Sequence, residues 1–399
     1  MNIFKKFYCR TYQTIFKLML PILPYREPKL LYGNTELVQV LRDLKVKSAL
    51  LVTDKGIKGL GLTNNLEKLI NKAEISLSVY DGTVPNPTTD NVASALKIYT
   101  ENNCECLIAF GGGSVMDCAK AVGARIARPN KTLSQMKGVL KVGKKIPTLI
   151  AVPTTAGTGS ETTLAAVITD SNTRHKYAIN DFPLIPSYAM LDPELTVGLP
   201  KHITSTTGMD ALTHAVEAYI GRSTTKETRQ KAKDAVRLIF ENLLEAYNDG
   251  TYILARENML TAAYYAGIAF TKSYVGYVHA VAHSLGGKYN IPHGFANAVI
   301  LPYMLKKYGK SIYKKLYELA VYAGLVEEHV THEEGAYKFI QHIEYMNSAM
   351  HIDNKIEGIQ EKDIIELART AEKEANPLYP VPVLFTAKQL EEIYYQIRG

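Results

Sequence analysis

The sequence lacks any run of apolar residues long enough to cross a membrane and any basic block typical of nucleic-acid binding. A transmembrane helix needs about 18 or more consecutive apolar residues, whereas the hydrophobic residues here, 46% of the chain, are interrupted well short of that length. The net charge is +7, but the cations are scattered and not interleaved with aromatic residues in one block. A mildly basic chain of this kind favours anionic small molecules such as phosphates, so we expect no nucleic-acid partner and no membrane span.

Cysteine is also scarce, with four residues in 399. Four cysteines in so long a chain do not make a disulfide framework, and we therefore expect a reducing, cytoplasmic location. Cys104 and Cys106 are closely spaced, but no second pair accompanies them. They are better explained as the lining of a strand than as half of a thiolate metal site.

The length predicts two domains, because 399 residues exceed what a single hydrophobic core usually supports. Between residues 28 and 197, short apolar segments at 48–54, 74–82 and 106–113 alternate with segments of helical periodicity. This alternation is typical of a parallel sheet covered by helices on both faces. The strand signals then fade, so we expect an α/β domain over 28–197 and an all-α domain over 198–399.

The first 27 residues form a separate extension with the pattern of an amphipathic helix. Apolar residues such as Phe4, Phe7 and Ile15 recur at helical spacing between basic residues. A signal peptide is disfavoured because Lys17 interrupts the apolar stretch and no small-residue cleavage site follows. We expect the apolar face to pack on the body of the protein or on a second subunit. Contact with a membrane surface, which basic amphipathic helices can make, is the less favoured interpretation.

A glycine-rich turn at 111–120 follows a buried strand and precedes a helix. Bare backbone and the unpaired N–H groups of a helix N-terminus suit an anion such as a phosphate. The turn is not the standard dinucleotide fingerprint, because G-x-G-x-x-G is absent and the acid-tipped strand, at Asp54, precedes the glycines. A tight strand-to-helix turn without a ligand would also explain the glycines.

A second polar loop, at 153–161, follows another apolar strand and is rich in small hydroxyl residues and glycine. A Ser/Thr capping turn could account for it without a ligand. Ligands of open α/β sheets, however, collect at the carboxyl ends of the strands, and three strand ends here carry polar groups. The residues expected at this edge are Asp54, Gly112, Gly113, Ser114, Thr154, Thr155 and Thr158.

The second half of the chain contains closely spaced carboxylate and imidazole groups. Asp210 and His214 are four residues apart, His279 and His283 are also four apart, and His293 follows shortly after. Residues at positions i and i+4 lie on one face of a helix. These groups could therefore meet at one metal ion.

Four motifs, in this order, resemble those of the iron-containing (group III) alcohol dehydrogenase family. They are GGGSVMDCAK at 111–120, PTTAGTGSE at 153–161, GMDALTHAVEAY at 208–219 and GYVHAVAHSLGGKYNIPHGFANAVILP at 276–302. The resemblance extends from about residue 28 to the end of the chain. It implies a dehydroquinate synthase-like architecture, with an α/β dinucleotide-binding domain, a helical metal-binding domain and the active site in the cleft between them.

The resemblance implies that the four metal ligands are Asp210, His214, His279 and His293. It places His283 near the nicotinamide, where an imidazole can relay a proton near neutral pH. Three imidazoles and a carboxylate suit Fe²⁺ or Zn²⁺ and are poorly suited to Ca²⁺ or Mg²⁺. We expect iron from the resemblance, although zinc fits the same ligands.

The resemblance also implies that the cofactor is NAD. It places Asp54 at the adenosine ribose, where a carboxylate favours NAD over the 2′-phosphate of NADP. It places Phe270 in the wall of the substrate pocket. The other positions that correspond to the family's cofactor site are Asn86 in the Asn-Pro-Thr loop, Gly112, Gly113 and Ser114 at the pyrophosphate, Thr154 and Thr155 on the adenine side, and Lys176 facing the cofactor.

The expected function is NAD- and metal-dependent interconversion of primary alcohols and aldehydes by hydride transfer, with the substrate oxygen on the metal. The resemblance further implies a homodimer, since the family usually associates through its N-terminal domain. Two features depart from the family pattern: the extension of about 27 residues, and Leu378 where many members have an Asn-Pro-Arg sequence. Both leave substrate preference and assembly open.

Three alternatives remain at this point. A lyase of the dehydroquinate synthase type would need a pocket rich in lysine and arginine, whereas the segment 266–277 is largely apolar, with Lys272 as the main exception. A glycerol dehydrogenase-like polyol oxidoreductase shares the chemistry and differs in substrate. A structural metal protein is disfavoured by the complete set of ligands.

Overall fold

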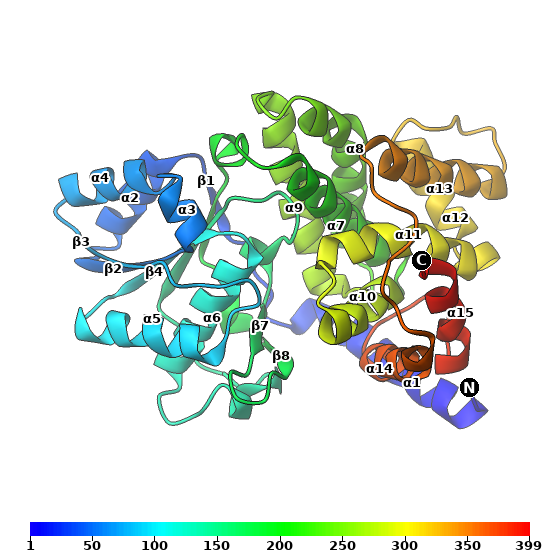
Figure 1. Cartoon of the computed structure of the whole chain (residues 1–399), viewed down its shortest axis with the longest axis horizontal. Coiled ribbons are helices and arrows are strands. Elements are labelled where there is room, and N and C mark those ends of the chain that lie inside the picture. Colours follow the sequence, from blue (N-terminus) through cyan, green and yellow to red (C-terminus); the bar gives the residue numbers. More distant parts are fainter. The chain divides into compact units, whose positions relative to one another are not determined.

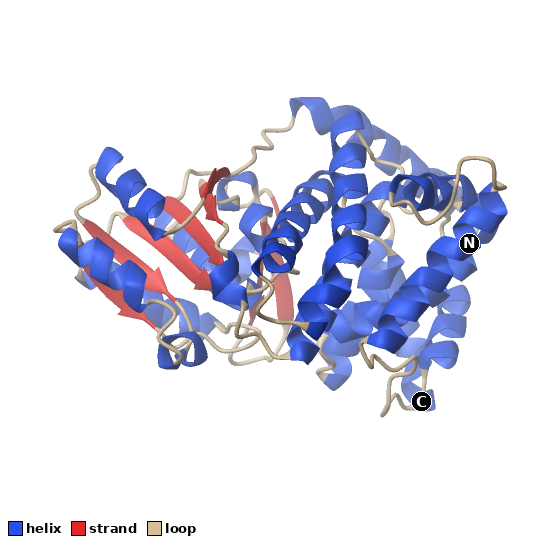
Figure 2. Cartoon of the chain, turned by 90° about the horizontal axis from the view of Figure 1, so that it is seen from above, coloured by secondary structure: helices blue, strands red, loops and turns tan.

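The computed structural model describes all 399 residues and divides into two compact units. One unit comprises residues 24–198, and the other joins residues 1–23 to residues 199–399. All the strands of the two sheets belong to the first unit, and the second is helical (Figures 1 and 2). No helix in the structure has the length and hydropathy that a membrane crossing requires.

The α/β unit is built on a parallel six-stranded sheet. Two of its inner strands, β2 and β4, are buried along their whole length, as expected for a parallel sheet covered on both faces. The predicted parallel α/β domain is therefore confirmed. In spatial order the strands are β1 (Lys29–Leu31), β9 (Tyr188–Met190), β6 (Thr148–Pro153), β4 (Cys106–Gly111), β2 (Ser48–Val52) and β3 (Ser76–Tyr80).

Two hydrophobic cores lie on opposite faces of this sheet. Successive residues of β4 alternate between them: Leu107 and Ala109 belong to one core, Ile108 and Phe110 to the other. Helices α5 and α6 cover the first face, and α2 and α4 cover the second. The helices of the unit are α2 (Asn34–Asp43), α3 (Lys55–Gly59), α4 (Asn64–Lys72), α5 (Thr89–Glu101) and α6 (Gly113–Ala127).

A second sheet of three short strands follows in the same unit. Its outer strands are β5 (Gly138–Val139), parallel to the central strand, and β7 (Ala165–Thr169), antiparallel to it; β8 (Lys176–Asn180) lies between them. This sheet carries Lys176 at the start of its central strand.

The helical unit contains no strand of either sheet, as the sequence pattern predicted. Its central helix, α7, is buried along most of its length. The main helices are α7 (Lys201–Ile220), α8 (Lys226–Asn248), α9 (Ile253–Ser273), α10 (Tyr277–Tyr289), α11 (His293–Tyr308), α12 (Tyr313–Tyr322), α13 (His332–Ala349), α14 (Ile364–Ala375) and α15 (Ala387–Ile397).

The predicted amphipathic helix, α1 (Ile3–Met19), also belongs to the helical unit (Figure 1). It rests on the segment 377–382 through polar contacts: Nε2 of Gln13 donates to the carbonyl of Tyr379 at 2.7 Å, and Arg10 donates to the carbonyl of Val381 at 2.7 Å. The expected packing of its apolar face on the body of the protein is met only in part. Leu20 is buried and the ring of Phe16 packs edge-on against Tyr274 with 5.0 Å between centroids, whereas most of the large apolar side chains of α1 are exposed. Packing on a second subunit stays a prediction. The supporting segment presents backbone carbonyls, which need donors, and so Arg10 and Gln13 face inward beside Cys9.

Candidate active site

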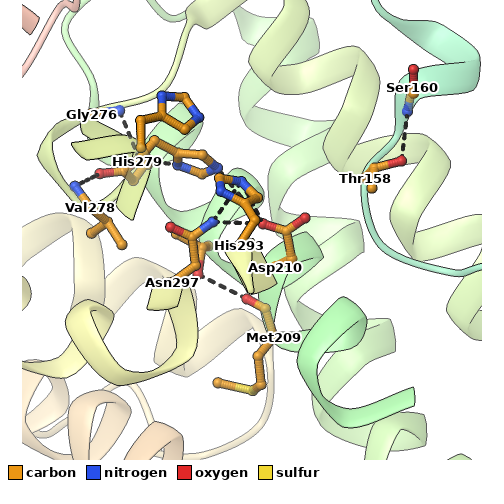
Figure 3. Close-up of polar contacts among 12 residues, drawn as sticks. Thr158, Ser160, Met209, Asp210, Gly276, Val278, His279, His293 and Asn297 are labelled. Atoms are coloured by element: carbon orange, nitrogen blue, oxygen red, sulfur yellow. Dashed lines mark hydrogen bonds and ion pairs between the residues drawn. The ribbon is translucent and has the colours of Figure 1, made fainter. Parts of the chain in front are cut away.

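Three helices bring the four predicted metal ligands together. Asp210 and His214 lie on one face of α7, His279 lies in the first turn of α10, and His293 is the first residue of α11. One ligand atom from each of the four side chains lies within 4.8 Å of the others. Three of the residues are buried and His293 is half-buried. Figure 3 shows Asp210, His279 and His293 with their side chains turned toward one another. The cluster has the residue types and the compactness of a metal site.

The two ring nitrogens of His279 have different surroundings, which indicates what this site could bind. Its Nδ1 lies 2.7 Å from Oε2 of Glu217. Because a carboxylate can only accept a hydrogen bond, we assign the proton of the neutral ring to Nδ1 and the lone pair to Nε2. Nε2 is buried, has no hydrogen-bond partner, and lies 3.8 Å from Oδ1 of Asp210. Desolvation, and then the neighbouring imidazoles of His214, His293 and His283, hold the pKa of His279 well below its usual value. A buried neutral imidazole with an unused lone pair fits a divalent cation.

Glu217 fixes that imidazole. Its carboxylate is buried on α7, seven residues after Asp210, and accepts hydrogen bonds from the backbone N–H of Gly276 at 2.7 Å and of Val278 at 2.8 Å, besides the one from His279. Burial raises the pKa of Glu217 to about 7, against the lowering effect of these bonds. A Cβ added to Gly276 would lie 2.6 Å from Oε1 of Glu217, so only glycine fits there.

Asn297 holds the other side of the cluster. It lies four residues after His293 on α11, and its Nδ2 is 2.7 Å from Oδ1 of Asp210 and 3.1 Å from Nε2 of His293 (Figure 3). The start of α11 packs closely on α7, because a Cβ at Gly294 would lie 2.4 Å from the carbonyl oxygen of Thr206. Neither Glu217 nor Asn297 was predicted from the sequence, although both stand at helical spacing from a predicted ligand.

His283 lies one turn after His279 but is not part of the ligand cluster. Its Nδ1 is 2.6 Å from Oε1 of Glu374, and its ring stacks on that of His293 with 5.1 Å between centroids. Burial raises the pKa of Glu374, but His283 and the hydroxyl of Tyr379 more than offset this, so the net pKa is lowered. The side chain of His283 is 42% exposed, which gives it access to solvent.

Phe270 borders the ligand cluster. It lies near the end of α9, and its ring stacks on that of His214 with 4.1 Å between centroids and an interplanar angle of 12°. Phe270 is half-buried. An apolar surface therefore lies directly beside one of the predicted metal ligands.

In the α/β unit, the glycine-rich turn and the threonine-rich loop follow the neighbouring strands β4 and β6. Gly112 precedes α6 and Gly113 is its first residue, and a Cβ added to Gly113 would lie 3.0 Å from the side chain of Thr158. The loop is shaped from within, since Oγ1 of Thr158 accepts a hydrogen bond from the N–H of Ser160 at 3.3 Å (Figure 3). Thr154, which is buried, donates its N–H to the carbonyl of Gly111 at 3.2 Å. Thus the two predicted loops lie side by side.

The Asn-Pro-Thr loop joins the same surface. Nζ of Lys176 donates to Oδ1 of Asn86 at 2.7 Å, and the N–H of Asn86 donates to Oγ of Ser114 at 3.3 Å. Asn86 has a φ of 57°, which turns the chain sharply at this point. Desolvation lowers the pKa of Lys176 below its usual value, and the charge of Asp117 offsets this only in part. Three predicted cofactor residues from distant parts of the chain are therefore connected.

Asp54 follows β2, the neighbour of β4, and caps α3 by accepting a hydrogen bond from the N–H of Ile57 at 2.9 Å. A Cβ added to Gly111 would lie 3.1 Å from Cδ1 of Ile57, so α3 begins close to the glycine-rich turn. Thr155 is the remaining predicted position: its side chain lies 3.5 Å from where a Cβ on Gly112 would stand.

Lys120 is a buried residue of this region that the sequence did not single out. Its Nζ lies within hydrogen-bonding distance of four oxygens, which share its three N–H donors. They are the carbonyl of Ser160 at 2.7 Å, the hydroxyl of Ser160 at 3.1 Å, the hydroxyl of Thr163 at 2.8 Å and the carbonyl of Ala165 at 2.9 Å. Burial lowers the pKa of Lys120 to about 8, against the opposite effects of nearby carboxylates. The ammonium group thus anchors the end of the threonine-rich loop to α6.

Comparison with known protein families gives a match over almost the whole chain. The model of the iron-containing alcohol dehydrogenases matches residues 28–193, and the model of the C-terminal domain of the Fe-containing alcohol dehydrogenase family matches residues 204–397. Both match regions begin after the N-terminal helix α1.

Individual proteins agree with this match. The chain is 36% identical over 362 residues to alcohol dehydrogenase 4 of Saccharomyces cerevisiae. The aligned region covers 90% of this chain and 93% of the yeast protein. It is 36% identical over 336 residues to an NAD-dependent methanol dehydrogenase of Bacillus methanolicus, covering 83% and 86% of the two chains. The crystal structure of a 1,3-propanediol oxidoreductase superposes with a TM-score of 0.89 at 34% identity, covering 94% of this chain and 99% of that one.

Proposed function

Because the chain belongs to the iron-containing alcohol dehydrogenase family, we propose that it interconverts primary alcohols and aldehydes by NAD-dependent hydride transfer at the cluster of Asp210, His214, His279 and His293. The observation that carries this proposal is the unused lone pair on Nε2 of His279, which is buried among the other three ligand side chains. A buried polar atom without a partner is costly unless a ligand uses it.

The proposed metal is Fe²⁺, with Zn²⁺ as the alternative. The family's name supports iron, and a set of three imidazoles and one carboxylate suits either ion. A divalent cation held there would supply a Lewis acid that polarises the oxygen of the alcohol or aldehyde.

The protein's own groups would orient the site and move the proton. Glu217 holds the ring of His279, and Asn297 holds the carboxylate of Asp210, which keeps these two ligand atoms in place. Phe270 offers an apolar surface for the carbon chain of the substrate. His283, oriented through Nδ1 by Glu374 and partly exposed, would exchange a proton with solvent through its other ring nitrogen.

We propose that NAD binds in the α/β unit, along the carboxyl ends of the strands. The N-terminus of α6 at Gly112 and Gly113 would receive the pyrophosphate, because its N–H groups and helix dipole favour an anion. The carboxylate of Asp54 would accept hydrogen bonds from the ribose hydroxyls and disfavour a 2′-phosphate. The remaining cofactor positions proposed are Asn86, Ser114, Thr154, Thr155, Thr158 and Lys176.

We further propose that the functional domains are residues 28–197 and 198–399, and that the enzyme is a cytoplasmic homodimer. The division of the compact units after Gly198 supports the domain limits. The dimer rests on the resemblance to the family. One chain has a mass of 44.3 kDa. Light scattering at micromolar concentration should give twice this mass, and a monomer would contradict the proposal.

A panel of substrates separates the dehydrogenase from its alternatives. Lys272, the main cation near the apolar segment, is engaged with Glu227 at 2.6 Å, which favours an apolar substrate over a phosphorylated one. We expect butanal with NADH, or a short primary alcohol with NAD, to give the highest kcat/KM. A higher kcat/KM with glycerol would indicate a polyol dehydrogenase, and turnover of a phosphorylated sugar acid without net NAD reduction would indicate a lyase.

A further inference from the structure

The helix α1 exposes an almost continuous apolar face. The large side chains on it include Phe4, Phe7 and Leu18, which are 82%, 73% and 73% exposed, and Ile3 and Ile15 are more than half exposed as well. They recur at spacings of three and four residues and so lie on one side of the helix. Isolated exposed apolar residues are ordinary, but a contiguous patch of this kind marks an interaction surface.

The orientation of this face is set by the contacts on the opposite side. Cys9 and Gln13 are buried against the body of the helical unit, and Arg10 donates to the carbonyls of Val381 and Pro382. Nζ of Lys5 forms an ion pair with Glu372 at 2.7 Å. These contacts hold α1 on the helical unit with its apolar side turned to solvent.

The charge of the helix has a single sign. The first 26 residues contain basic residues and no acidic residue, the first acid being Glu27. Lys6 and Lys17 are exposed, and helical spacing places both on the same flank of the apolar face. An apolar stripe flanked by lysines is the pattern of a helix that lies in the interface of a membrane.

The cationic surface continues beyond the end of the helix. The pKa of Lys315 is lowered to about 8, first by burial and then by the nearby charges of Arg229 and Arg222. Glu318 raises this pKa in part, and Lys17 adds a further small lowering. Arg222 and Arg229 are exposed. The last turn of α1 therefore adjoins a group of cations on the same unit.

We propose that α1 docks the enzyme on the surface of a bilayer containing anionic phospholipids. The exposed apolar side chains would enter the boundary between headgroups and acyl chains, and the flanking cations would contact lipid phosphates. A second copy of the chain is the less suitable occupant, because pairing two such helices would bring cations of the same sign together. Residues 1–27 lie outside the matched family regions, so this docking is a property of this chain beyond the proposed dehydrogenase activity.

Flotation of the full-length protein with lipid vesicles tests the apolar face. Wild-type protein should float with vesicles of equal parts phosphatidylglycerol and phosphatidylcholine and stay behind with pure phosphatidylcholine. Leu18→Gln should weaken the partition about tenfold, since it removes most of one buried apolar side chain. Leu60→Gln is the matched control, because Leu60 is 76% exposed but lies in the other unit.

The charge contribution has its own variant. The double substitution Lys6→Gln and Lys17→Gln should weaken binding about 25-fold, at about fivefold for each cation near an anionic surface. The double substitution Lys68→Gln and Lys72→Gln, two exposed positions on α4, should have no effect. Binding should also fall when the salt concentration rises. Alcohol oxidation in solution should be equal in all these variants, because none of them touches the proposed active site.

Two results would overturn the proposal. One is absence of vesicle binding by the wild-type protein, or binding that Leu18→Gln leaves unchanged. The other is a decrease in oligomeric state in Leu18→Gln, measured by light scattering, without lipid binding by the wild type. The second result would assign the apolar face to an interface between copies of the chain.

Discussion

Replacing Glu217 with glutamine tests whether this carboxylate holds His279 in its metal-binding state. One oxygen of Glu217 accepts from the N–H of Val278, and the other accepts from both the N–H of Gly276 and Nδ1 of His279. Glutamine has the same shape but turns one acceptor into an NH₂ donor. At least one of the three buried donors must then face another donor, which costs about 1–3 kcal/mol.

That cost should appear in metal binding as well as in stability. The amide also lacks the negative charge of the carboxylate, so even where its oxygen keeps the bond from His279, the imidazole loses the charged partner that raises its basicity as a ligand. Loss of such an outer partner lowers metal affinity about 10- to 100-fold. We therefore expect Glu217→Gln to weaken metal binding at least about tenfold and to lower the free energy of unfolding by about 1–3 kcal/mol.

The assay is competition for iron or zinc between the purified protein and a chelator, with urea unfolding measured in parallel. Glu318→Gln is the matched control. The carboxylate of Glu318 accepts a hydrogen bond at 2.5 Å from the hydroxyl of Tyr219, a residue of α7 that is not one of the four ligands. A Glu217→Gln protein that is less stable yet binds metal as tightly as the wild type would refute the reasoning. Glu217 would then serve only to hold the start of α10.

Three further predictions concern Asp54, His283 and Glu161, the last a buried residue at the end of the threonine-rich loop. Asp54→Gly should raise kcat/KM with NADPH relative to NADH, and a wild-type enzyme that already prefers NADPH would defeat the assignment of Asp54 to the ribose. His283→Ala should keep its metal but lose most of its turnover, and added imidazole should restore part of it; full activity without imidazole would show that His283 moves no proton. Burial raises the pKa of Glu161 to about 7, so the folded state binds its proton more tightly than the unfolded state does. Its contribution to stability is therefore present below about pH 4 and is lost as the pH rises to about 7. Glu161→Gln should reduce the decrease in melting temperature over that range, and an unchanged pH dependence would contradict this.

The sequence predicted the parts of the molecule that follow from local patterns. The parallel sheet was predicted because its strands are short apolar segments between helices, and β2 and β4 are indeed buried throughout. Asp210, His214 and His279 were predicted as metal ligands because helical spacing and motif order point to them. The structure brings their side chains together with that of His293, and their role as ligands stays a prediction. The three-stranded sheet was not predicted, since strands as short as Gly138–Val139 carry almost no periodic signal.

Other features depend on contacts between distant segments and left no local signal. Glu374 lies 91 residues from its partner His283 in the chain, so only the fold reveals that pair. Lys120 stands within a predicted motif, but its role depends on the path of the loop at Ser160. The sequence did not predict how much of the apolar face of α1 the body of the protein covers, because periodicity defines an apolar face but not what covers it. The carbonyls of the segment 377–382 decide that question.

The metal content of the His279→Ala protein tests the central claim most directly. We expect close to one iron or zinc ion per chain in the wild type, lost in His279→Ala, with NAD binding retained because the α/β unit has its own hydrophobic cores. Hydride transfer should fall by orders of magnitude, since the reaction needs the Lewis acid. His202→Ala, an exposed histidine on the same helix α7 as Asp210 and His214, is the control and should keep both metal and activity. A His279→Ala protein with full metal content and normal turnover would contradict the account.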